Sequence, residues 1–435
     1  MAGSRNRLPL SDLCQAIIDC EHKTAPTQPW GIPSIRTTNI KNGSLDIENA
    51  NRVSEETYKK WTARLEPQPG DLILAREAPV GEVGIVPLGQ RVCLGQRTVL
   101  IRTNQQKLLS RYLLYLLLTP EMRHEMVSRA EGSTVPHLNM SDIRNLEIPH
   151  LPTLSEQKAI AHILGTLDNK IELNQQMNRN LEAIAQAIFK SWFVNFDPVR
   201  AKMEGRQPAG MDAATAALFP DSLEGLQVGE IPMGWKLAPL AEVIEVNPRR
   251  TLSQGETALY LDMQNMPTHG HRPNTWISRP FGSGTKFMNG DTLLARITPC
   301  LENGKTAFVD FLEDGQVGWG STEYIIFRPK PPLPVEYGYY LARSEELRAY
   351  AIQNMTGSSG RQRVPSECFQ QYLIVISQDA IARCFGDLVK PLMATIKTNS
   401  EQSHTLATIR DTLLPKLMSG EIPVKEAEKI VEDVA

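Results

Sequence analysis

The sequence predicts an α+β fold made of two similar globular halves, each closed by a long helix. Three observations support this prediction. Short motifs recur after roughly 220 to 230 residues, short β-type runs separated by glycine and proline fill each half, and a heptad pattern of apolar residues closes each half. We therefore expect the two long helices to pair with each other as an antiparallel, coiled-coil-like element with pseudo-twofold symmetry.

The internal repeat is carried by three short motifs in the same order. Residues 9–13 resemble 239–243, and residues 70–76, which begin with Gly-Asp, resemble 290–296. The segment Gly132–Pro136 resembles Gly357-Ser358-Ser359 followed by Val364-Pro365. Such periodicity indicates two copies of one structural unit.

Each half also alternates short apolar runs with turn residues, as expected for an α+β domain. The runs in question are residues 72–74, 83–86, 98–101 and 324–327. A short helix is expected at residues 110–129 of the first half, matched by one at 335–353 of the second.

The two long helices show the clearest match. Spacings of four and three define a seam in the first helix, formed by Ile160, Leu164, Leu167, Ile171, Asn174, Asn178, Leu181, Ala185, Ile188 and Trp192. Positions 225 residues later form the second seam, Phe385, Val389, Leu392, Ile396, Asn399, Ser403, Leu406, Arg410, Leu413 and Leu417, in which only Arg410 does not fit. Central polar residues can fix the register of such a pair. The alternative is that each helix packs on its own half only.

These patterns divide the chain into six segments. Asp197-Pro198 ends the first helix, and a stretch rich in glycine, alanine and proline follows it. The segments are a first domain at 1–150, a spacer helix at 151–199, a connector at 200–232, a second domain at 233–377, a second spacer helix at 378–420 and a tail at 421–435.

Composition restricts the function classes. The 435 residues are 41% hydrophobic with a net charge of -3, and the six cysteines form no Cys-x-x-Cys pair. We therefore expect reduced thiols, no structural metal and no membrane span, in a cytoplasmic protein. The absence of a basic excess means that DNA binding would need clustered cations or charge supplied by partners.

Several segments resemble a known family. Leu154–Lys158, Leu167–Asn174 and Ala187–Val199 resemble the central conserved region of specificity subunits from Type I restriction-modification systems. Asp19–Thr24 and Gly70-Asp71 with Arg76–Pro79 resemble the family's first target-recognition domain, and Leu413–Gly420 resembles its second conserved region. The resemblance covers nearly the whole chain.

The resemblance implies a division of labour. Two target-recognition domains each read one half of a bipartite site in double-stranded DNA, and the antiparallel helices space them. The helices also dock two adenine methyltransferase subunits, and a nuclease-translocase subunit can join. S-adenosylmethionine and ATP then belong to the partners, and this chain binds no cofactor. Because the two domains differ outside their shared framework, we expect an asymmetric, interrupted target.

Candidate DNA contacts are polar residues on loops, where arginine can bridge guanine and glutamine can bridge adenine. They are His22, Lys23, Thr24, Arg76, Ser133, Thr134, His137, Arg249, Arg250, Arg296, Ser358, Ser359, Arg361, Gln362 and Arg363. For the loop residues the alternative is a solvated loop. Arg76 and Arg296 can instead pair with acids inside their domains, and Arg249 with Arg250 can be an ordinary surface pair.

No catalytic motif stands out. Gly304-Lys305-Thr306 lacks the first glycine of a phosphate loop, since Pro299 takes that place, and no dinucleotide fingerprint is found. We therefore expect no catalytic residue and no metal-ligating residue in this chain. Two other functions stay open, which are a coiled-coil scaffold that binds proteins and a divergent DNA-modifying enzyme.

Overall fold

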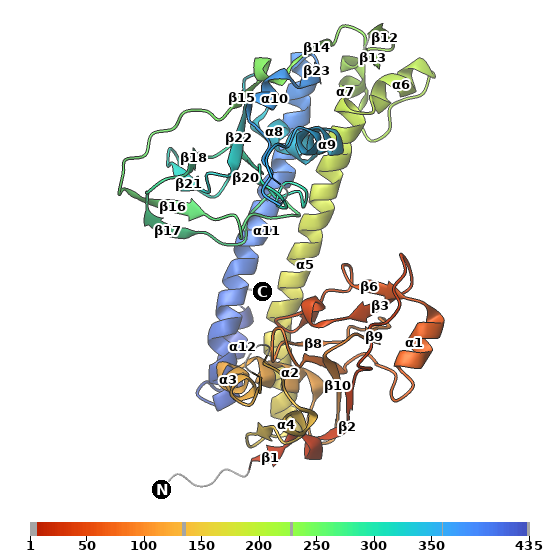
Figure 1. The fold of residues 1–435 in the computed structure, drawn as a ribbon, viewed down its shortest axis with the longest axis vertical. Helices are drawn as coiled ribbons and strands as arrows, with labels where there is room; N and C mark the ends of the chain where they lie inside the picture. Colours follow the sequence, from red (N-terminus) through yellow and green to blue (C-terminus); the bar gives the residue numbers. More distant parts are fainter. Residues whose placement is uncertain (1–6, 133–135, 227–228, 359, 433–435) are drawn as a thin grey trace. The chain divides into compact units, whose positions relative to one another are not determined.

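The computed structural model describes residues 7–132, 136–226, 229–358 and 360–432. They form two compact units (Figure 1). The first unit combines the described residues up to Glu172 with those from His404 onward, and the second lies within Leu173–Ser403. Each unit contains one α+β domain and parts of two long helices, α5 (Leu154–Phe193) and α11 (Asp379–Ser419).

The domain of the first unit is built around an antiparallel four-stranded sheet of order β2-β10-β7-β8, formed by Cys14–Asp19, Thr98–Thr103, Leu72–Ala75 and Val83–Ile85. A second sheet has the order β6-β3-β9, formed by Asn51–Val53, Ile32–Ile35 and Cys93–Leu94. Two short pairs complete it, β1 (Leu8–Pro9) with β11 (Glu147–Ile148) and β4 (Ile40–Lys41) with β5 (Ser44–Leu45). Strand β7 is apolar on both faces because Leu72 and Leu74 enter one core while Ile73 enters another.

The domain of the second unit repeats this arrangement. Its antiparallel sheet has the order β15-β22-β19-β20, formed by Ile244–Val246, Tyr324–Pro329, Thr292–Ala295 and Thr306–Phe308. Its second sheet has the order β17-β16-β21-β18, formed by Ile277–Pro280, Thr257–Leu261, Gly318–Gly320 and Thr285–Phe287. A pair of β14 (Lys236–Pro239) with β23 (Leu373–Ile376) matches β1 with β11.

The strand pairings confirm the internal repeat that the sequence predicts. The first sheets run in the same order, and each second sheet contains one parallel pair, β3 with β9 and β16 with β21. The repeated Gly-Asp motif forms the same turn in both domains. Gly70 and Gly290 have φ of 90° and 85°, and the following Asp71 and Asp291 each accept a backbone N–H three residues earlier at 2.8 Å.

The prediction of a single helix at residues 110–129 is wrong in one respect, because two helices occupy this segment. They are α2 (Ser110–Leu118) and α3 (Pro120–Ser128), matched by α8 (Val335–Arg343) and α9 (Glu345–Gln353). Thr119 and Ser344 have extended backbones and cap the following helix with their hydroxyls. The remaining short helices of the two domains are α1 (Glu55–Trp61), α4 (Met140–Arg144) and α10 (Glu367–Gln371).

Helix α5 begins with a capping box that explains part of its sequence motif. Thr153 Oγ1 accepts the backbone N–H of Glu156, and Glu156 Oε2 accepts the backbone N–H of Thr153 at 3.0 Å. The next residue, Gln157, is 1% exposed, accepts the backbone N–H of Leu109 at 2.9 Å and donates to the carbonyl of Lys107 at 3.1 Å. Gln157 thus joins α5 to the segment that precedes α2.

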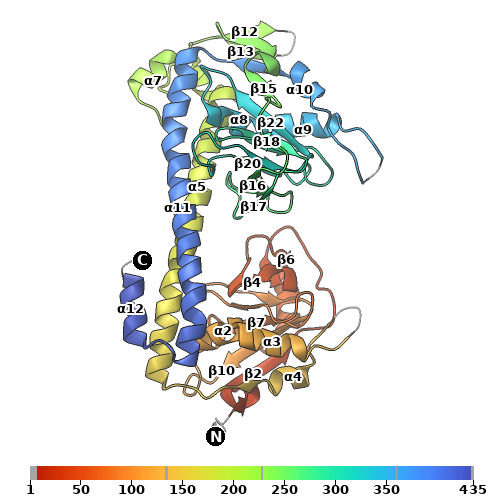
Figure 2. The same cartoon turned by 90° about the vertical axis from the view of Figure 1, so that its left-hand side faces the viewer.

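Helices α5 and α11 lie side by side in antiparallel orientation in the second unit (Figure 1 and Figure 2). A layer of amides joins them, in which Asn399 Nδ2 donates to Asn178 Oδ1 at 2.9 Å and Asn174 Nδ2 donates to Gln402 Oε1 at 2.8 Å. Asn178 Nδ2 donates to Ser400 Oγ at 3.1 Å. The polar centre of the predicted seam is therefore hydrogen-bonded, which lowers the cost of burying it.

Arg410 is the one residue that does not fit the predicted seam. It lies in the first unit and pairs with Asp168 of α5 at 2.7 Å. Asp168 also accepts the hydroxyl of Tyr115 from α2 at 2.6 Å. In the second unit Tyr339 of α8 donates in the same way to Glu182 of α5, again at 2.6 Å. Each domain is thus joined to α5 by a tyrosine–carboxylate hydrogen bond.

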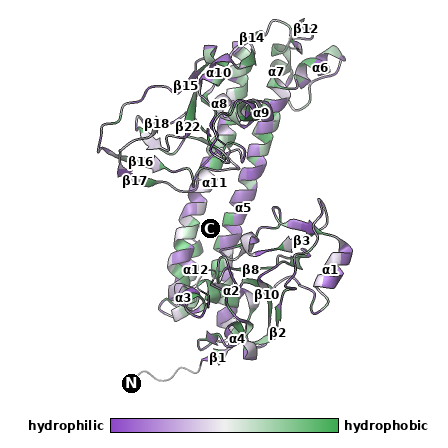
Figure 3. Cartoon of the chain, in the orientation of Figure 1, coloured by the Kyte–Doolittle hydropathy of each residue, from purple (hydrophilic) through white to green (hydrophobic). Residues whose placement is uncertain are grey.

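The other seam residues are buried or half-buried, and hydrophilic and hydrophobic residues alternate along both helices (Figure 3). The seam in the described residues comprises Ile160, Leu164, Leu167, Ile171, Leu181, Ala185, Ile188, Trp192, Phe385, Val389, Leu392, Ile396, Ser403, Leu406, Leu413 and Leu417. Three apolar residues of α5 point outward instead. Leu173, Met177 and Ile184 are 49%, 41% and 50% exposed and share one helix face.

The segment expected as a connector has structure of its own. It contains the end of α6 (Asp197–Met203), α7 (Ala213–Leu218) and the hairpin of β12 (Leu223–Leu226) with β13 (Gly229–Pro232). Phe219 packs edge-on against Trp192 of α5 at 5.0 Å between ring centroids. A final helix, α12 (Val424–Glu432), occupies the tail and buries Ala427 and Val431 in the core of the first unit.

All six cysteines are free thiols, as the sequence predicts. In the described part of the chain, no helix combines the length and hydropathy that crossing a membrane requires.

Candidate nucleic-acid interface

The segment His22–Thr24 directly follows the edge strand β2. Lys23 and Thr24 are exposed, whereas the imidazole of His22 lies 3.1 Å from Asp19 Oδ2. Lys23 therefore has an exposed ammonium group with no ion pair among the described residues, while His22 is held by Asp19.

Asp19, Cys20 and His22 bring three potential metal ligands within 4.8 Å of one another. Asp19 is already paired with the Arg76 guanidinium at 2.7 Å. Burial raises the pKa of the Cys20 thiol, so it stays protonated and is a poor ligand. This set does not fit a cation well.

Arg76 and Arg296 occupy equivalent positions after β7 and β19 but differ in their partners. Besides its ion pair with Asp19, Arg76 donates from Nε to the carbonyl of Leu138 at 2.8 Å. Strand β15 of the second domain corresponds to β2 of the first, which ends at Asp19. When the pairing of β15 with β22 is extended by two residues beyond Val246, Pro248 takes the position of Asp19. Within the described residues Arg296 forms no ion pair, and its Nε is buried without an acceptor. Arg76 therefore stabilises its domain through an ion pair, whereas Arg296 interacts electrostatically with Glu367 but forms no ion pair within the described residues.

A loop closed by a backbone pair is present at the same place in both domains. In the first, Glu131 and His137 exchange hydrogen bonds of 3.0 and 2.8 Å; in the second, Thr356 and Arg363 exchange two of 2.9 Å. The predicted contacts Ser133, Thr134 and Ser359 lie outside the described residues. His137 is half-buried at the base of the first loop.

The second loop separates its predicted contacts into two groups. Arg363 pairs with Glu323 at 2.7 Å, and the carbonyl of Gln362 accepts the backbone N–H of Thr298 at 3.0 Å. Ser358 and Arg361 are exposed. The guanidinium of Arg361 is therefore exposed, while that of Arg363 is held by Glu323 at the base of the loop.

The pair Arg249-Arg250 is also divided. Arg250 is largely buried and bonds Asp291 at 3.0 Å, which also receives Arg328 at 3.2 Å. Arg249 is exposed. The corresponding aspartate of the first domain, Asp71, pairs with Arg102 at 2.7 Å.

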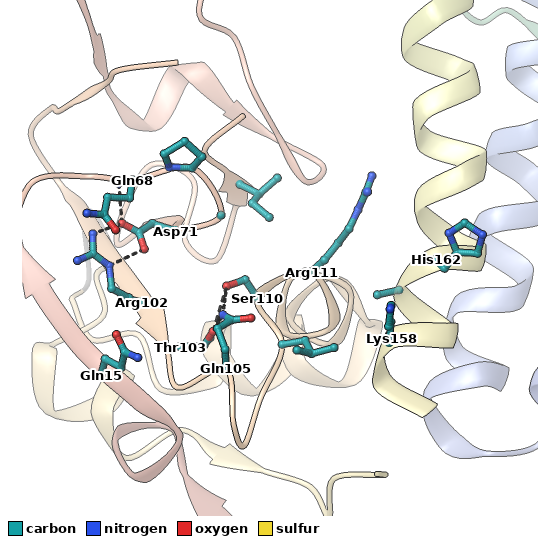
Figure 4. Close-up of a pocket in the computed structure, with 15 residues that line it drawn as sticks. Gln15, Gln68, Asp71, Arg102, Thr103, Gln105, Ser110, Arg111, Lys158 and His162 are labelled. Carbon is teal, nitrogen blue, oxygen red and sulfur yellow. Dashed lines mark hydrogen bonds and ion pairs between the residues drawn. The ribbon is translucent and has the colours of Figure 1, made fainter. Parts of the chain in front are cut away.

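A surface pocket of about 600 Å³ lies in the first unit between the sheet and α5 (Figure 4). Its lining includes Arg111, Lys158 and His162, and Arg111 rests on α5 by donating to Asn169 Oδ1 at 2.7 Å. Ser110 Oγ bonds Thr103 and Gln105 rather than a general base. The pocket therefore has a cationic lining without an activated nucleophile.

Two cations with no counterpart among the predicted contacts lie on the second sheet of the second unit, Arg279 and Lys286. The guanidinium of Arg279 lies 4.8 Å from the centroid of Tyr260 and 5.3 Å from that of Trp319. The sequence offers only a weak signal for them, because the aromatic residues Tyr260 and Trp319 that lie beside Arg279 are far apart along the chain.

Comparison with known proteins places these features in a family. Residues 9–183 match the model of the Type I restriction modification DNA specificity domain. The chain is 26% identical, over 91% of its length and 88% of the relative's, to the Type I restriction enzyme MjaIX specificity subunit of Methanocaldococcus jannaschii. It is 24% identical to the HindI specificity subunit of Haemophilus influenzae, over 74% of this chain and 80% of the relative.

The fold agrees with these similarities. The crystal structure of the S subunit of a Type-I restriction-modification system from M. genitalium superposes with a TM-score of 0.53 at 17% identity, covering 96% of this chain and 97% of the other. Residues 9–183 thus match the type I specificity-domain family, and along most of its sequence and in its fold the chain is similar to specificity subunits of type I restriction-modification systems.

Proposed function

We propose that the chain selects the DNA sequence on which a type I complex acts, each domain reading one half of an asymmetric, interrupted site. One observation carries the proposal furthest. The two domains share their sheet order but differ in the partners of equivalent residues, since Arg76 pairs with Asp19 whereas Arg296 faces Pro248 at that position and has no ion pair among the described residues. A shared framework with different contact residues suits two different half-sites, whereas identical domains would read a palindrome.

The two long helices, on this proposal, set the spacing between the half-sites and dock two adenine methyltransferase subunits. Leu173, Met177 and Ile184 support the docking role, because they expose a row of apolar surface on α5. The chain itself breaks and forms no bonds. S-adenosylmethionine and ATP are used by the methyltransferase and by any nuclease-translocase partner, in the cytoplasm.

The proposal is tested by selecting bound duplexes from a randomised pool, using the full chain co-purified with its methyltransferase. The expected product has two different conserved blocks separated by a fixed number of unconserved base pairs. If the complex assembles but enriches no sequence, the specificity role is wrong and the chain acts as a scaffold.

The docking role is tested by co-purification of an Ile184→Asp variant. This variant should no longer retain the methyltransferase, since a charge replaces exposed apolar contact surface.

A further inference from the structure

One face of the second sheet of the second unit packs on a core, and the other carries two cations around a smaller apolar cluster of Leu252, Ala258 and Trp319. Leu259, Leu261 and Phe287 enter the core beneath it. The register aligns Arg279 with Ala258, Tyr260 with Trp319, and Trp319 with Lys286, so these side chains share the other face. We call Tyr260, Arg279, Phe281, Lys286 and Trp319 the cation–aromatic face.

Aromatic rings hold both cations of this face in place. Arg279 lies over Tyr260 and Trp319, and Lys286 Nζ is 4.7 Å from the centroid of Phe281. In the described part of the chain, neither Arg279 nor Lys286 forms an ion pair with a carboxylate, and the indole N–H of Trp319 has no acceptor. Arg279 and Lys286 therefore offer positive charge without a carboxylate partner in the described residues, whereas the indole N–H of Trp319 is buried.

The equivalent face of the first domain is closed and neutral. Tyr58 of α1 packs there with Ile32, Val53 and Cys93. The guanidinium of Arg91 lies 4.5 Å from the centroid of Tyr58, but Glu55 neutralises it at 2.9 Å. In the second domain the buried residues Leu252, Ala258 and Trp319 pack together at this face, and neither Arg279 nor Lys286 forms an ion pair among the described residues.

We propose that the cation–aromatic face binds phosphate oxygens of duplex DNA and thereby orients the second domain on its half-site. The proposal rests on the function proposed above. Phosphates suit the face better than bases, because Trp319 is only 4% exposed and cannot serve as a platform on which bases stack. Localised cations are also what a chain of net charge -3 needs in order to bind a polyanion.

The test measures how DNA affinity of the full chain with its methyltransferase depends on salt concentration. Replacing Arg279 and Lys286 by Gln should reduce the slope of log K against log salt by about 2, since each lost phosphate contact removes about 0.9. The preferred bases of both half-sites should stay the same, because phosphate contacts carry no sequence information. The charge-conserving variant Arg279→Lys/Lys286→Arg should keep the original slope.

A matched control removes two cations that already have partners, Arg206, which pairs with Glu204, and Lys236, which pairs with Glu242. Arg206→Gln/Lys236→Gln should leave the slope unchanged. Equal slopes for the cation–aromatic variant and this control, with selective binding intact, would overturn the phosphate role alone. A change in the preferred bases would also overturn it. Absence of selective binding by the unaltered complex would instead overturn the proposed function and this inference together.

Discussion

At the scale of single residues, the surroundings of each arginine decide which candidate contact remains available for DNA. Arg76, Arg250 and Arg363 each bond a carboxylate of their own domain, whereas Arg249 and Arg361 are exposed. Sequence position alone could not separate these groups, because the partners Asp19, Asp291 and Glu323 lie 40 to 57 residues away along the chain.

Arg361→Ala should relax reading of the second half-site and leave the first unchanged. A bidentate arginine–guanine contact contributes about 1–3 kcal/mol of discrimination against other bases. The measurement is the affinity for duplexes altered in one half-site at a time, with Arg206→Ala as the control. An equal loss at both half-sites would contradict separate reading by the two domains.

His271 should make the stability of the second unit depend on pH. Its ring is fully buried between Glu182 Oε2 at 3.4 Å and Asp310 Oδ2 at 3.3 Å, beside Tyr339, which bonds Glu182 and Arg343, and beside Arg272, which pairs with Asp310. Burial alone would lower the pKa of His271, but the two carboxylates outweigh it and raise the pKa. A raised pKa in the folded state stabilises the protein at low pH, and this contribution is lost as pH rises through the folded pKa.

The free energy of unfolding in urea, measured between about pH 6 and pH 9, checks this expectation. The unaltered protein should lose more stability with rising pH than the His271→Gln variant does. His404→Gln, which alters an exposed histidine, should behave like the unaltered protein. Identical pH dependence in all three proteins would show that folding does not shift the pKa of His271, and a gain of stability with rising pH that needs His271 would show a lowered pKa; either result would contradict the expectation.

At the scale of elements, the long helices were predictable because heptad spacing extends over many turns. The break between α2 and α3 was not predicted, because the apolar pattern continues through it and only the cap at Thr119 marks it. Residues 200–232 were predicted to be a connector on account of their glycine, alanine and proline content. Phe219 packs in the core of the second unit, which is a tertiary effect that local composition does not reveal.

The amide layer between α5 and α11 should contribute cooperatively to stability. Asn178→Ala removes its bonds to Asn399, Ser400 and the carbonyl of Ile396, and leaves Asn399 buried with fewer partners. We expect a loss of about 1–3 kcal/mol from this substitution. A double-mutant cycle with Asn399→Ala should give a coupling energy of about 0.5–3 kcal/mol. Strict additivity of the two substitutions would mean that the layer does not act as a unit.

At the scale of the whole molecule, the repeat determined most of what the sequence could predict. Two copies of one motif order implied two copies of one fold, and the strand orders agree. The low net charge gave no such guidance. It sums 46 basic and 49 acidic side chains, and only the three-dimensional arrangement separates those in internal ion pairs from the others.

The central claim is that this chain chooses the DNA sequence on which its complex acts. Mapping methylated adenines in DNA from cells that make the partner methyltransferase, with and without this chain, tests the claim most directly. The account predicts a new, interrupted and asymmetric methylated motif that requires the chain. An unchanged map, in cells where the complex is shown to assemble, would contradict it.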